Sequence, residues 1–237
     1  MRTALIVCCI LIFTFITYPL RILHKILYRE RAERFKLNYK LLRKLTRMVL
    51  CINGARIKTT NLHLSKIDMP VLFVSNHKSN MDSVILISLI DTNFIFIGKR
   101  ELSRVPIIGA WFRDIGSIFL DREDLRASLN SIIKAQSFLE KGASVLIYPE
   151  GKRISVNELD KFKAGSFKLA TKSNVPVVPI AIKGSAGLLE NKKIFASANI
   201  DIAFGEMICP DSEMFSNTVN LSDYAQKKVQ EMYANFD

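Results

Sequence analysis

Short apolar runs alternate along the chain with longer segments in which apolar residues recur every three or four positions. The short runs are rich in β-branched residues and predict strands at residues 71–74, 94–97, 118–120, 145–148, 177–182 and 200–204. Helical spacing predicts one helix over residues 125–140, ending before Gly142, and a closing helix over residues 222–236 with Ser222 as its N-cap. Strands that alternate with helices indicate an α/β fold with its functional sites at the strand ends.

The first apolar segment is longer than any of these strands. Residues 4–20 carry no charge, and as a helix they would rise about 25 Å, close to a hydrocarbon thickness of about 30 Å. A signal-peptide core is the alternative, but bulky residues stand where a cleavage site needs small ones, which favours an uncleaved anchor. Only Arg2 precedes the segment, whereas basic residues follow it at Arg21, Lys25, Arg29, Arg31 and Arg34. This bias predicts that the rest of the chain lies in the cytoplasm.

A second segment, residues 35–52, is amphipathic. Its apolar residues recur at helical spacing: Leu41, Leu42, Leu45, Met48, Val49 and Ile52. Basic residues lie on another side of the same helix: Lys36, Lys40, Arg43 and Arg47. Such a helix either lies in a membrane interface with its cations at lipid phosphates or packs on a domain core, and the lack of acidic partners on the basic side favours the membrane. We therefore predict a helical hairpin anchor in residues 1–55 and a folded domain in residues 56–237.

The net charge agrees with a lipid partner. Lys and Arg number 34 against 22 Asp and Glu, and the formal charge of +12 suits either nucleic acid or an anionic membrane. The apolar N-terminal segment favours the membrane and argues against nucleic acid as the partner. The four cysteines show no metal-ligand spacing and no activating neighbours, and the sequence has no glycine-rich nucleotide loop. We therefore expect no metal and no bound cofactor.

The strand predicted at residues 71–74 is followed by Asn-His-Lys-Ser-Asn-Met-Asp at residues 76–82. A carboxylate that holds one ring nitrogen of a histidine leaves the other nitrogen free to take a proton from an alcohol, so His77 and Asp82 are candidates for a general base and its partner. The structural alternative is that Ser79 or Asn80 caps a helix and Asp82 stabilises its first turn. Both interpretations can hold at once, because a helix N-terminus keeps a nearby imidazole neutral.

Three further blocks follow in order along the chain. They are residues 99–122, residues 148–153 followed by 162–165, and residues 175–180. With these four blocks, roughly residues 70–185 resemble the 1-acylglycerol-3-phosphate O-acyltransferase family of the glycerolipid acyltransferases. The resemblance implies an α/β fold with a mixed sheet flanked by helices. It also implies transfer of a fatty acyl group from a thioester, acyl-CoA or acyl carrier protein, to the free hydroxyl of lysophosphatidic acid, which forms phosphatidic acid.

The resemblance also implies roles for individual residues. The family pattern Asn-His-x-Ser-x-x-Asp matches Asn76, His77, Ser79 and Asp82, which implies that His77 is the base and that Asp82 orients it. The substrate-binding candidates in the second and third blocks are Lys99, Arg122, Glu150, Gly151, Lys152 and Arg153, with Arg122 and Arg153 at the phosphate-binding positions. The fourth block packs the site or the acyl chain in the family, and here it contains Val175, Pro176 and Pro179. We expect backbone amides at the helix start after Ser79 to hold the developing oxyanion.

The third block departs from the family pattern, because Lys152 stands where the family usually has Thr or Ser before the arginine, and Ile154 stands where it often has Ser after the arginine. A further cation suits a phosphate and equally suits another acidic head group, so an acyltransferase for another lysophospholipid or lipid acceptor stays open as the alternative. A non-catalytic basic protein that binds membrane or nucleic acid is a more distant alternative. Arginine presents a planar fork to phosphate oxygens, and its presence at Arg122 and Arg153 fits one anionic group held from two sides.

Overall fold

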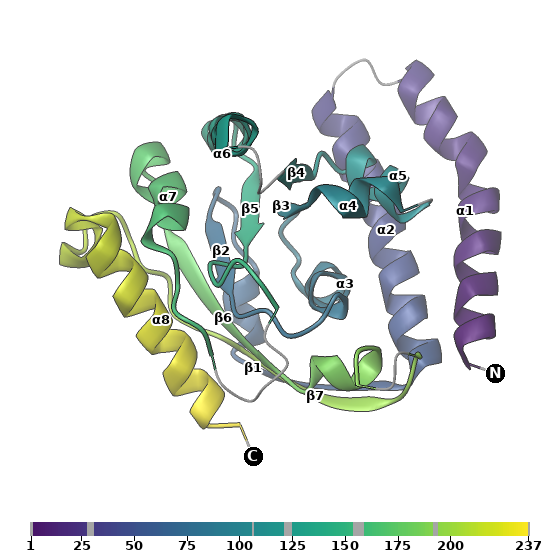
Figure 1. Ribbon diagram of the computed structural model, residues 1–237. Helices are drawn as coiled ribbons and strands as arrows, with labels where there is room; N and C mark the ends of the chain where they lie inside the picture. Colours follow the sequence, from purple (N-terminus) through teal and green to yellow (C-terminus); the bar gives the residue numbers. More distant parts are fainter. Residues whose placement is uncertain are drawn as a thin grey trace.

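The computed structural model describes residues 2–27, 31–105, 107–120, 125–153, 159–191 and 194–236. Within these residues a seven-stranded sheet has the strand order β1-β7-β6-β2-β5-β3-β4 (Figure 1). The strands are β1 (Ala55–Thr60), β2 (Leu72–Ser75), β3 (Phe94–Lys99), β4 (Ile118–Leu120), β5 (Ser144–Ile147), β6 (Val177–Lys183) and β7 (Ala198–Phe204). Strands β2 to β6 pair in parallel, whereas β7 is antiparallel to β6 and parallel to β1. The expected mixed sheet is confirmed. The apolar pattern missed β1, whose residues alternate between partly buried and exposed.

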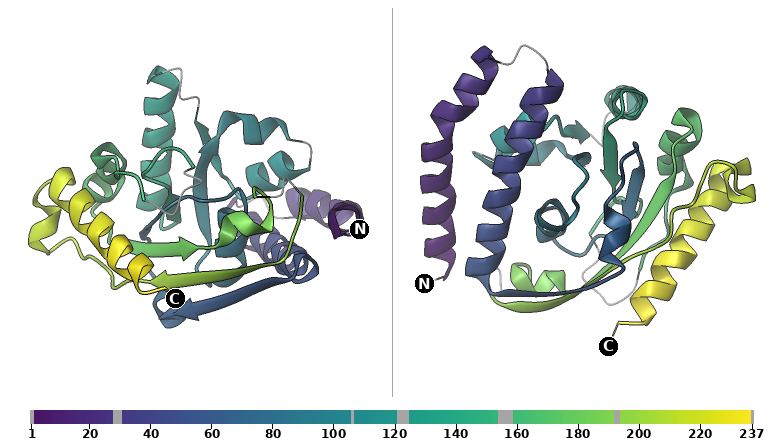
Figure 2. Two further views of the ribbon diagram at one scale, coloured as in Figure 1. Left: turned by 60° about the horizontal axis from the view of Figure 1, so that its bottom comes forward. Right: turned by 180° about the vertical axis from the view of Figure 1, so that it is seen from behind.

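Helices cover both faces of the sheet (Figure 2). On one face α2 (Arg31–Asn53), α3 (Met81–Leu89) and α5 (Ile108–Asp114) share an apolar core with the strands, and Phe73, Phe94 and Trp111 are among its largest members. On the other face α6 (Leu125–Glu140), α7 (Lys168–Ser173) and α8 (Thr218–Ala234) form a second core. The remaining short elements are α4 (Arg100–Arg104), η1 (Leu62–Ser65), η2 (Ala164–Phe167), η3 (Ser185–Leu188) and η4 (Glu213–Ser216). The central strands are therefore buried on both sides, which explains why they are continuous apolar runs in the sequence.

The closing helix α8 begins at Thr218 and not at the predicted cap, Ser222. The side chain of Asn217 caps it by accepting hydrogen bonds from the backbone N–H groups of Val219, at 2.9 Å, and Asn220, at 2.8 Å. Ser222 is buried inside the helix and donates to the carbonyl oxygen of Phe162 at 3.2 Å. The prediction was wrong because the first turn of α8 is largely exposed, so the apolar period becomes visible only after that turn.

The N-terminal helix α1 (Arg2–Leu27) runs beside α2 along the edge of the domain (Figures 1 and 2). Its residues 2–24 are long and apolar enough to cross a membrane, and they are largely unburied. One side of α1 contacts Trp111 of α5: the indole Nε1 donates to Thr14 Oγ1 at 3.1 Å, and the Arg21 guanidinium lies 4.3 Å from the ring centroid and pairs with Asp114. The other side is an exposed apolar surface on which Phe15 is 82% exposed. An apolar surface of this kind indicates a partner such as lipid.

Helix α2 packs as a core helix, which corrects the interpretation of residues 35–52 as a helix with its apolar side in lipid. Leu42, Leu45 and Val49 are buried in the core that α2 shares with α3. Two of its cations cap the C-terminal end of α3: Arg43 Nη2 donates to the carbonyl oxygen of Ile90 at 2.7 Å, and Arg47 Nε donates to that of Ser88 at 3.0 Å. The last carbonyl groups of a helix lack intrahelical partners, and arginine supplies donors to them.

The partners of Arg43 and Arg47 also explain the charge pattern that favoured lipid in the sequence. Both side chains donate to backbone oxygens outside α2, and Arg43 also pairs with the carboxylate of Asp91 at 3.8 Å. Lys36 and Lys40 are exposed, as expected for residues on the outer side of α2. The candidate membrane surface is therefore the apolar side of α1 and not that of α2.

The topology brings the ends of two neighbouring parallel strands to one edge of the sheet. Val74 of β2 is paired with Ile147 of β5, so the segments that follow both strands leave the sheet side by side. Residues 76–82 follow β2, and residues 148–153 follow β5. In open α/β sheets this edge is the usual place for a ligand.

Candidate active site

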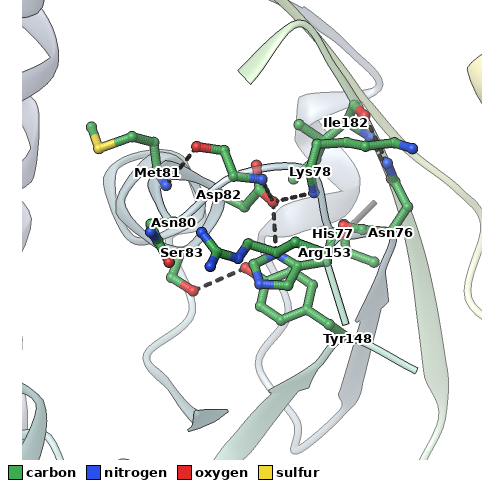
Figure 3. A network of polar contacts seen from close by, with 12 residues as sticks. Asn76, His77, Lys78, Asn80, Met81, Asp82, Ser83, Tyr148, Arg153 and Ile182 are labelled. Carbon is green, nitrogen blue, oxygen red and sulfur yellow. Dashed lines mark hydrogen bonds and ion pairs between the residues drawn. The ribbon is translucent and has the colours of Figure 1, made fainter. Parts of the chain in front are cut away.

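Asn76 fixes the segment between β2 and α3. Its side chain is buried and bridges the backbone of Ile182 in β6, where Nδ2 donates to the carbonyl oxygen and Oδ1 accepts from the N–H, both at 2.8 Å (Figure 3). A buried amide that satisfies both groups of one residue holds the two segments in a single register. The backbone of the next residue, His77, is therefore fixed to the central sheet.

His77 and Asp82 form the contact expected from the sequence, with Nδ1 2.8 Å from Oδ2. The same carboxylate oxygen accepts the backbone N–H groups of Lys78 and Ser79, both at 2.8 Å, and Asp82 is fully buried. Because Oδ2 is an acceptor, Nδ1 carries the ring proton and Nε2 keeps its lone pair. Among the described residues Nε2 has no hydrogen-bond partner, and the side chain is 18% exposed. The imidazole is therefore oriented to take a proton from a group that enters the site.

Tyr148 lies against the other side of the imidazole. The two rings stack with their centroids 4.1 Å apart and their planes inclined by 17°, and the Tyr148 hydroxyl is 3.0 Å from Ser83 Oγ (Figure 3). Burial, and after it the charge of Asp82, raises the pKa of Tyr148 well above its usual value, so the phenol stays neutral. Tyr148 was not among the site residues predicted from the sequence. Its place directly before the Pro-Glu-Gly sequence of the third block was the available signal.

The backbone amides at the start of α3 are engaged, which contradicts their expected role as oxyanion donors. The N–H groups of Lys78 and Ser79 donate to Asp82. The N–H of Asn80 donates to Glu190 Oε1 at 2.8 Å, and that of Met81 donates to Ser79 Oγ at 2.9 Å. The expectation failed because side chains of the same loop and of a distant one take up these donors. Ser79 caps the helix, as the structural alternative proposed, while Asp82 holds His77.

Glu150 is a second buried carboxyl group in the site, and it lies beside His77. It is 1% exposed, and Oε2 accepts the backbone N–H of His77 at 3.4 Å. Burial raises the pKa of Glu150 to about 7, and the hydrogen bond from His77 and the charge of Lys78 oppose this rise. The neighbouring Gly151 has a positive φ of 74°, and a β-carbon there would lie 2.7 Å from Lys163 Nζ. The backbone conformation therefore disfavours a side chain at position 151, whereas the flexible end of Lys163 could move away from it.

The raised pKa of Glu150 predicts how stability depends on pH. The folded protein keeps the proton on Glu150 up to about pH 7, whereas the unfolded chain loses it near the ordinary value of 4.5. The folded state therefore binds more protons between these values, and this group lowers the free energy of unfolding as pH rises from about 4.5 to 7. Glutamine does not titrate, so the free energy of unfolding of Glu150→Gln should not show this fall. As pH rises from 5 to 8, we expect the wild type to lose about 1 to 3 kcal/mol more stability than the variant. Denaturant unfolding of both proteins in detergent at the two pH values measures this, and parallel pH dependences would contradict it.

The two cations of the third block point to different partners. Arg153 Nη1 lies 3.4 Å from Glu190 Oε1, so Arg153 is joined through Glu190 to the loop that carries His77. Lys152 is exposed and pairs with Asp160 at 3.3 Å, beside a cavity of about 590 Å³ that Glu150 also lines. The structure therefore links Arg153, and not Lys152, through Glu190 to the loop that carries His77.

Within the part of the chain that the structure describes, the remaining residues predicted from the sequence are not seen in contact with His77 or Asp82. Arg122 lies outside the described residues, and Lys99 is described only as the last residue of β3. Val175, Pro176 and Pro179 are buried. The carbonyl oxygen of Pro176 accepts the N–H of Leu72 at 2.9 Å, and Pro179 is paired with Val74 in the sheet. The fourth block thus packs against β2, the strand that leads to His77.

The chain is similar in sequence to known proteins. A family model described as Acyltransferase matches residues 56–183. A probable 1-acyl-sn-glycerol-3-phosphate acyltransferase of Mycoplasma genitalium is 28% identical over 211 residues, 84% of this chain and 78% of the relative. The chloroplastic 1-acyl-sn-glycerol-3-phosphate acyltransferase LPAT1 of Arabidopsis thaliana is 38% identical over 127 residues, 54% of this chain and 35% of the relative.

A solved structure has the same fold. The crystal structure of the 1-acyl-sn-glycerophosphate (LPA) acyltransferase PlsC from Thermotoga maritima has a TM-score of 0.79 to this protein, and the match covers 100% of both chains. The two sequences are 24% identical, so this likeness concerns the fold.

Proposed function

Because this chain belongs to the acyltransferase family, we propose that it transfers a fatty acyl group from a thioester to the free hydroxyl of lysophosphatidic acid, which forms phosphatidic acid. The observation that carries the proposal is the His77–Asp82 pair, in which Nδ1 is held at 2.8 Å and Nε2 is left without a partner among the described residues. The Mycoplasma and Arabidopsis relatives, both named as 1-acyl-sn-glycerol-3-phosphate acyltransferases, support this acceptor.

The proposed reaction proceeds in one step without a covalent enzyme intermediate. The acceptor's phosphate binds Arg153, whose side chain is 38% exposed, and the free hydroxyl meets His77 Nε2. His77 takes the hydroxyl proton as the oxygen attacks the thioester carbonyl carbon. Asp82 stabilises the imidazolium that forms, and the proton returns to the sulfur of the carrier as the carbon–sulfur bond breaks. These steps use side chains of this chain alone, with no metal or bound cofactor.

The acyl donor and the head group are tested by one assay. Detergent-purified protein is given lysophosphatidic acid with acyl-CoA or with acylated acyl carrier protein, and phosphatidic acid is measured. Product with either donor supports the proposal and identifies the donor. Acylation of lysophospholipids that lack the phosphomonoester, without acylation of lysophosphatidic acid, would favour the alternative acceptor and overturn the proposal.

We also propose that the exposed apolar side of α1 inserts into the cytoplasmic leaflet. Phe15 and Ile16 are 82% and 62% exposed on this side, whereas Arg21 is held by Asp114 of the domain. We expect the double substitution Phe15→Asp and Ile16→Asp to reduce sedimentation with anionic phospholipid vesicles several-fold, because two charges would enter the apolar surface. Val219→Asp, at a 54% exposed position in α8, is the matched control. Equal sedimentation of all three proteins would contradict this attachment.

A further inference from the structure

Glu190 connects two of the sequence blocks although it belongs to neither. It lies after β6 and η3, and its side chain reaches back to the first turn of α3. Oε2 accepts the Ser79 hydroxyl at 2.6 Å, Oε1 accepts the Asn80 N–H at 2.8 Å, and Oε1 also lies 3.4 Å from Arg153 Nη1. One carboxylate thus joins the loop of the candidate base to the arginine that would bind phosphate.

We propose that Glu190 is a positioning residue that holds the Arg153 guanidinium at a fixed place beside the His77 loop and thereby selects acceptors that carry a phosphate near the reacting hydroxyl. This inference rests on the proposed function, because it assigns the acceptor's phosphate to Arg153. It adds a residue that acts through Arg153 and does not itself bind the substrate.

The lengths of the three contacts show which side of the bridge is fixed. The bonds to Ser79 and Asn80 are short and are made by a charged acceptor at a helix N-terminus, where the helix dipole favours a negative charge. The contact with Arg153 is longer and involves one nitrogen. Glu190 is therefore anchored to the catalytic loop and holds the arginine by one end.

The remaining part of the arginine fork is available to a ligand. Nε and Nη2 of Arg153 have no hydrogen-bond partner within the described residues, and its side chain is 38% exposed. Arginine binds phosphate through two parallel N–H groups, so this edge suits a phosphate while Nη1 stays with Glu190. The separation between that phosphate and His77 Nε2 is then set by the protein, and it determines which hydroxyl of the acceptor meets the base.

If Glu190 instead competed with the acceptor's phosphate for Arg153, the expected change in the KM would have the opposite sign. A carboxylate beside Arg153 also competes with an incoming phosphate, and if competition were its main effect, its removal would lower the KM for lysophosphatidic acid. Positioning predicts that its removal raises the KM, because Arg153 is no longer held in place. The sign of the change in KM therefore distinguishes the two roles.

The test is a double-mutant cycle of wild type, Glu190→Gln, Arg153→Ala and the double variant, assayed with lysophosphatidic acid as the varied substrate. Glutamine keeps an acceptor oxygen for the Asn80 N–H but loses the charge that holds Arg153. We expect Glu190→Gln to raise the KM about two- to fivefold, the range for one partly exposed ion pair, with kcat within twofold of the wild type. In the Arg153→Ala background the same substitution should change the KM by less than the error of the measurement.

A matched control and a stability measurement separate positioning from a general loss of structure. Glu213→Gln removes an exposed carboxylate in η4 and should leave both kinetic parameters unchanged. An unchanged or lowered KM in Glu190→Gln would overturn the inference, as would an equal effect with and without Arg153, or a fall in kcat that accompanies a lower Tm. Absence of product from the wild type would instead refute the proposed acceptor, so the two failures are distinguishable.

Discussion

Replacing His77 with alanine is expected to lower kcat for phosphatidic acid formation by about 10²- to 10⁴-fold, the usual contribution of a positioned general base. The imidazole is the group whose free nitrogen can take the hydroxyl proton, because Asp82 occupies the other nitrogen. The stacked Tyr148 cannot replace it, because burial raises the pKa of that phenol well above its usual value and keeps it protonated. Product formation from lysophosphatidic acid and an acyl thioester measures the loss.

The control for this variant is His63→Ala, because His63 is an exposed histidine in η1. It should keep wild-type kcat, and both variants should sediment with phospholipid vesicles as the wild type does, since α1 is untouched. Turnover of the His77 variant at the wild-type rate would rule out the base. Loss of vesicle binding together with activity would point to a folding defect.

Asp82→Asn is expected to cause a loss of similar size, about 10²- to 10⁴-fold in kcat, with a smaller effect on the KM. Oδ2 receives His77 and the backbone N–H groups of Lys78 and Ser79, so a neutral amide oxygen can take its place with little movement. The negative charge that stabilises the imidazolium is lost, and the new NH₂ group enters the buried position of Oδ1, which has no partner among the described residues. The loss of activity in Asp82→Asn therefore reports the missing charge more than a change in the position of His77.

The dependence of kcat on pH checks this explanation. Without the carboxylate, the imidazolium that forms during the reaction loses its neighbouring negative charge, so the pH–rate profile of Asp82→Asn should differ from that of the wild type. Asp68→Asn, at an exposed carboxylate elsewhere in the chain, should leave the profile unchanged. If Asp82→Asn retained full activity, Asp82 would be a helix-capping group only, which is the structural alternative that the motif allowed.

The contact between His77 and Asp82 could be predicted from the sequence. His77 and Asp82 are five positions apart and follow a buried strand, so the strand end and the first helical turn bring them together with no distant residue. The same locality explains why residues 125–140 were predicted as a helix with the bounds that α6 has. Apolar periodicity and short-range hydrogen bonds act within a few residues, and the order of residues displays them.

Contacts that residues from distant segments make with the site could not be predicted in this way. Glu190 lies outside all four blocks, and the β6 strand and η3 bring it to Ser79 and Arg153. The amides at the start of α3 looked available as oxyanion donors until the tertiary structure supplied Glu190 as the acceptor of one of them. No periodicity marks such a residue, because its position depends on how the chain crosses the sheet.

The N-terminal region shows the same division between local pattern and tertiary contact. Its sequence alone determined that there are two helical segments, one uniformly apolar and one amphipathic, because the period of the side chains depends only on neighbours in the chain. Which surface the apolar side of α2 meets was decided by the fold: Leu42, Leu45 and Val49 pack on the domain, and Arg43 binds the carbonyl groups at the end of α3. An amphipathic helix buries its apolar side against whatever is adjacent, and only the tertiary structure determines what that is.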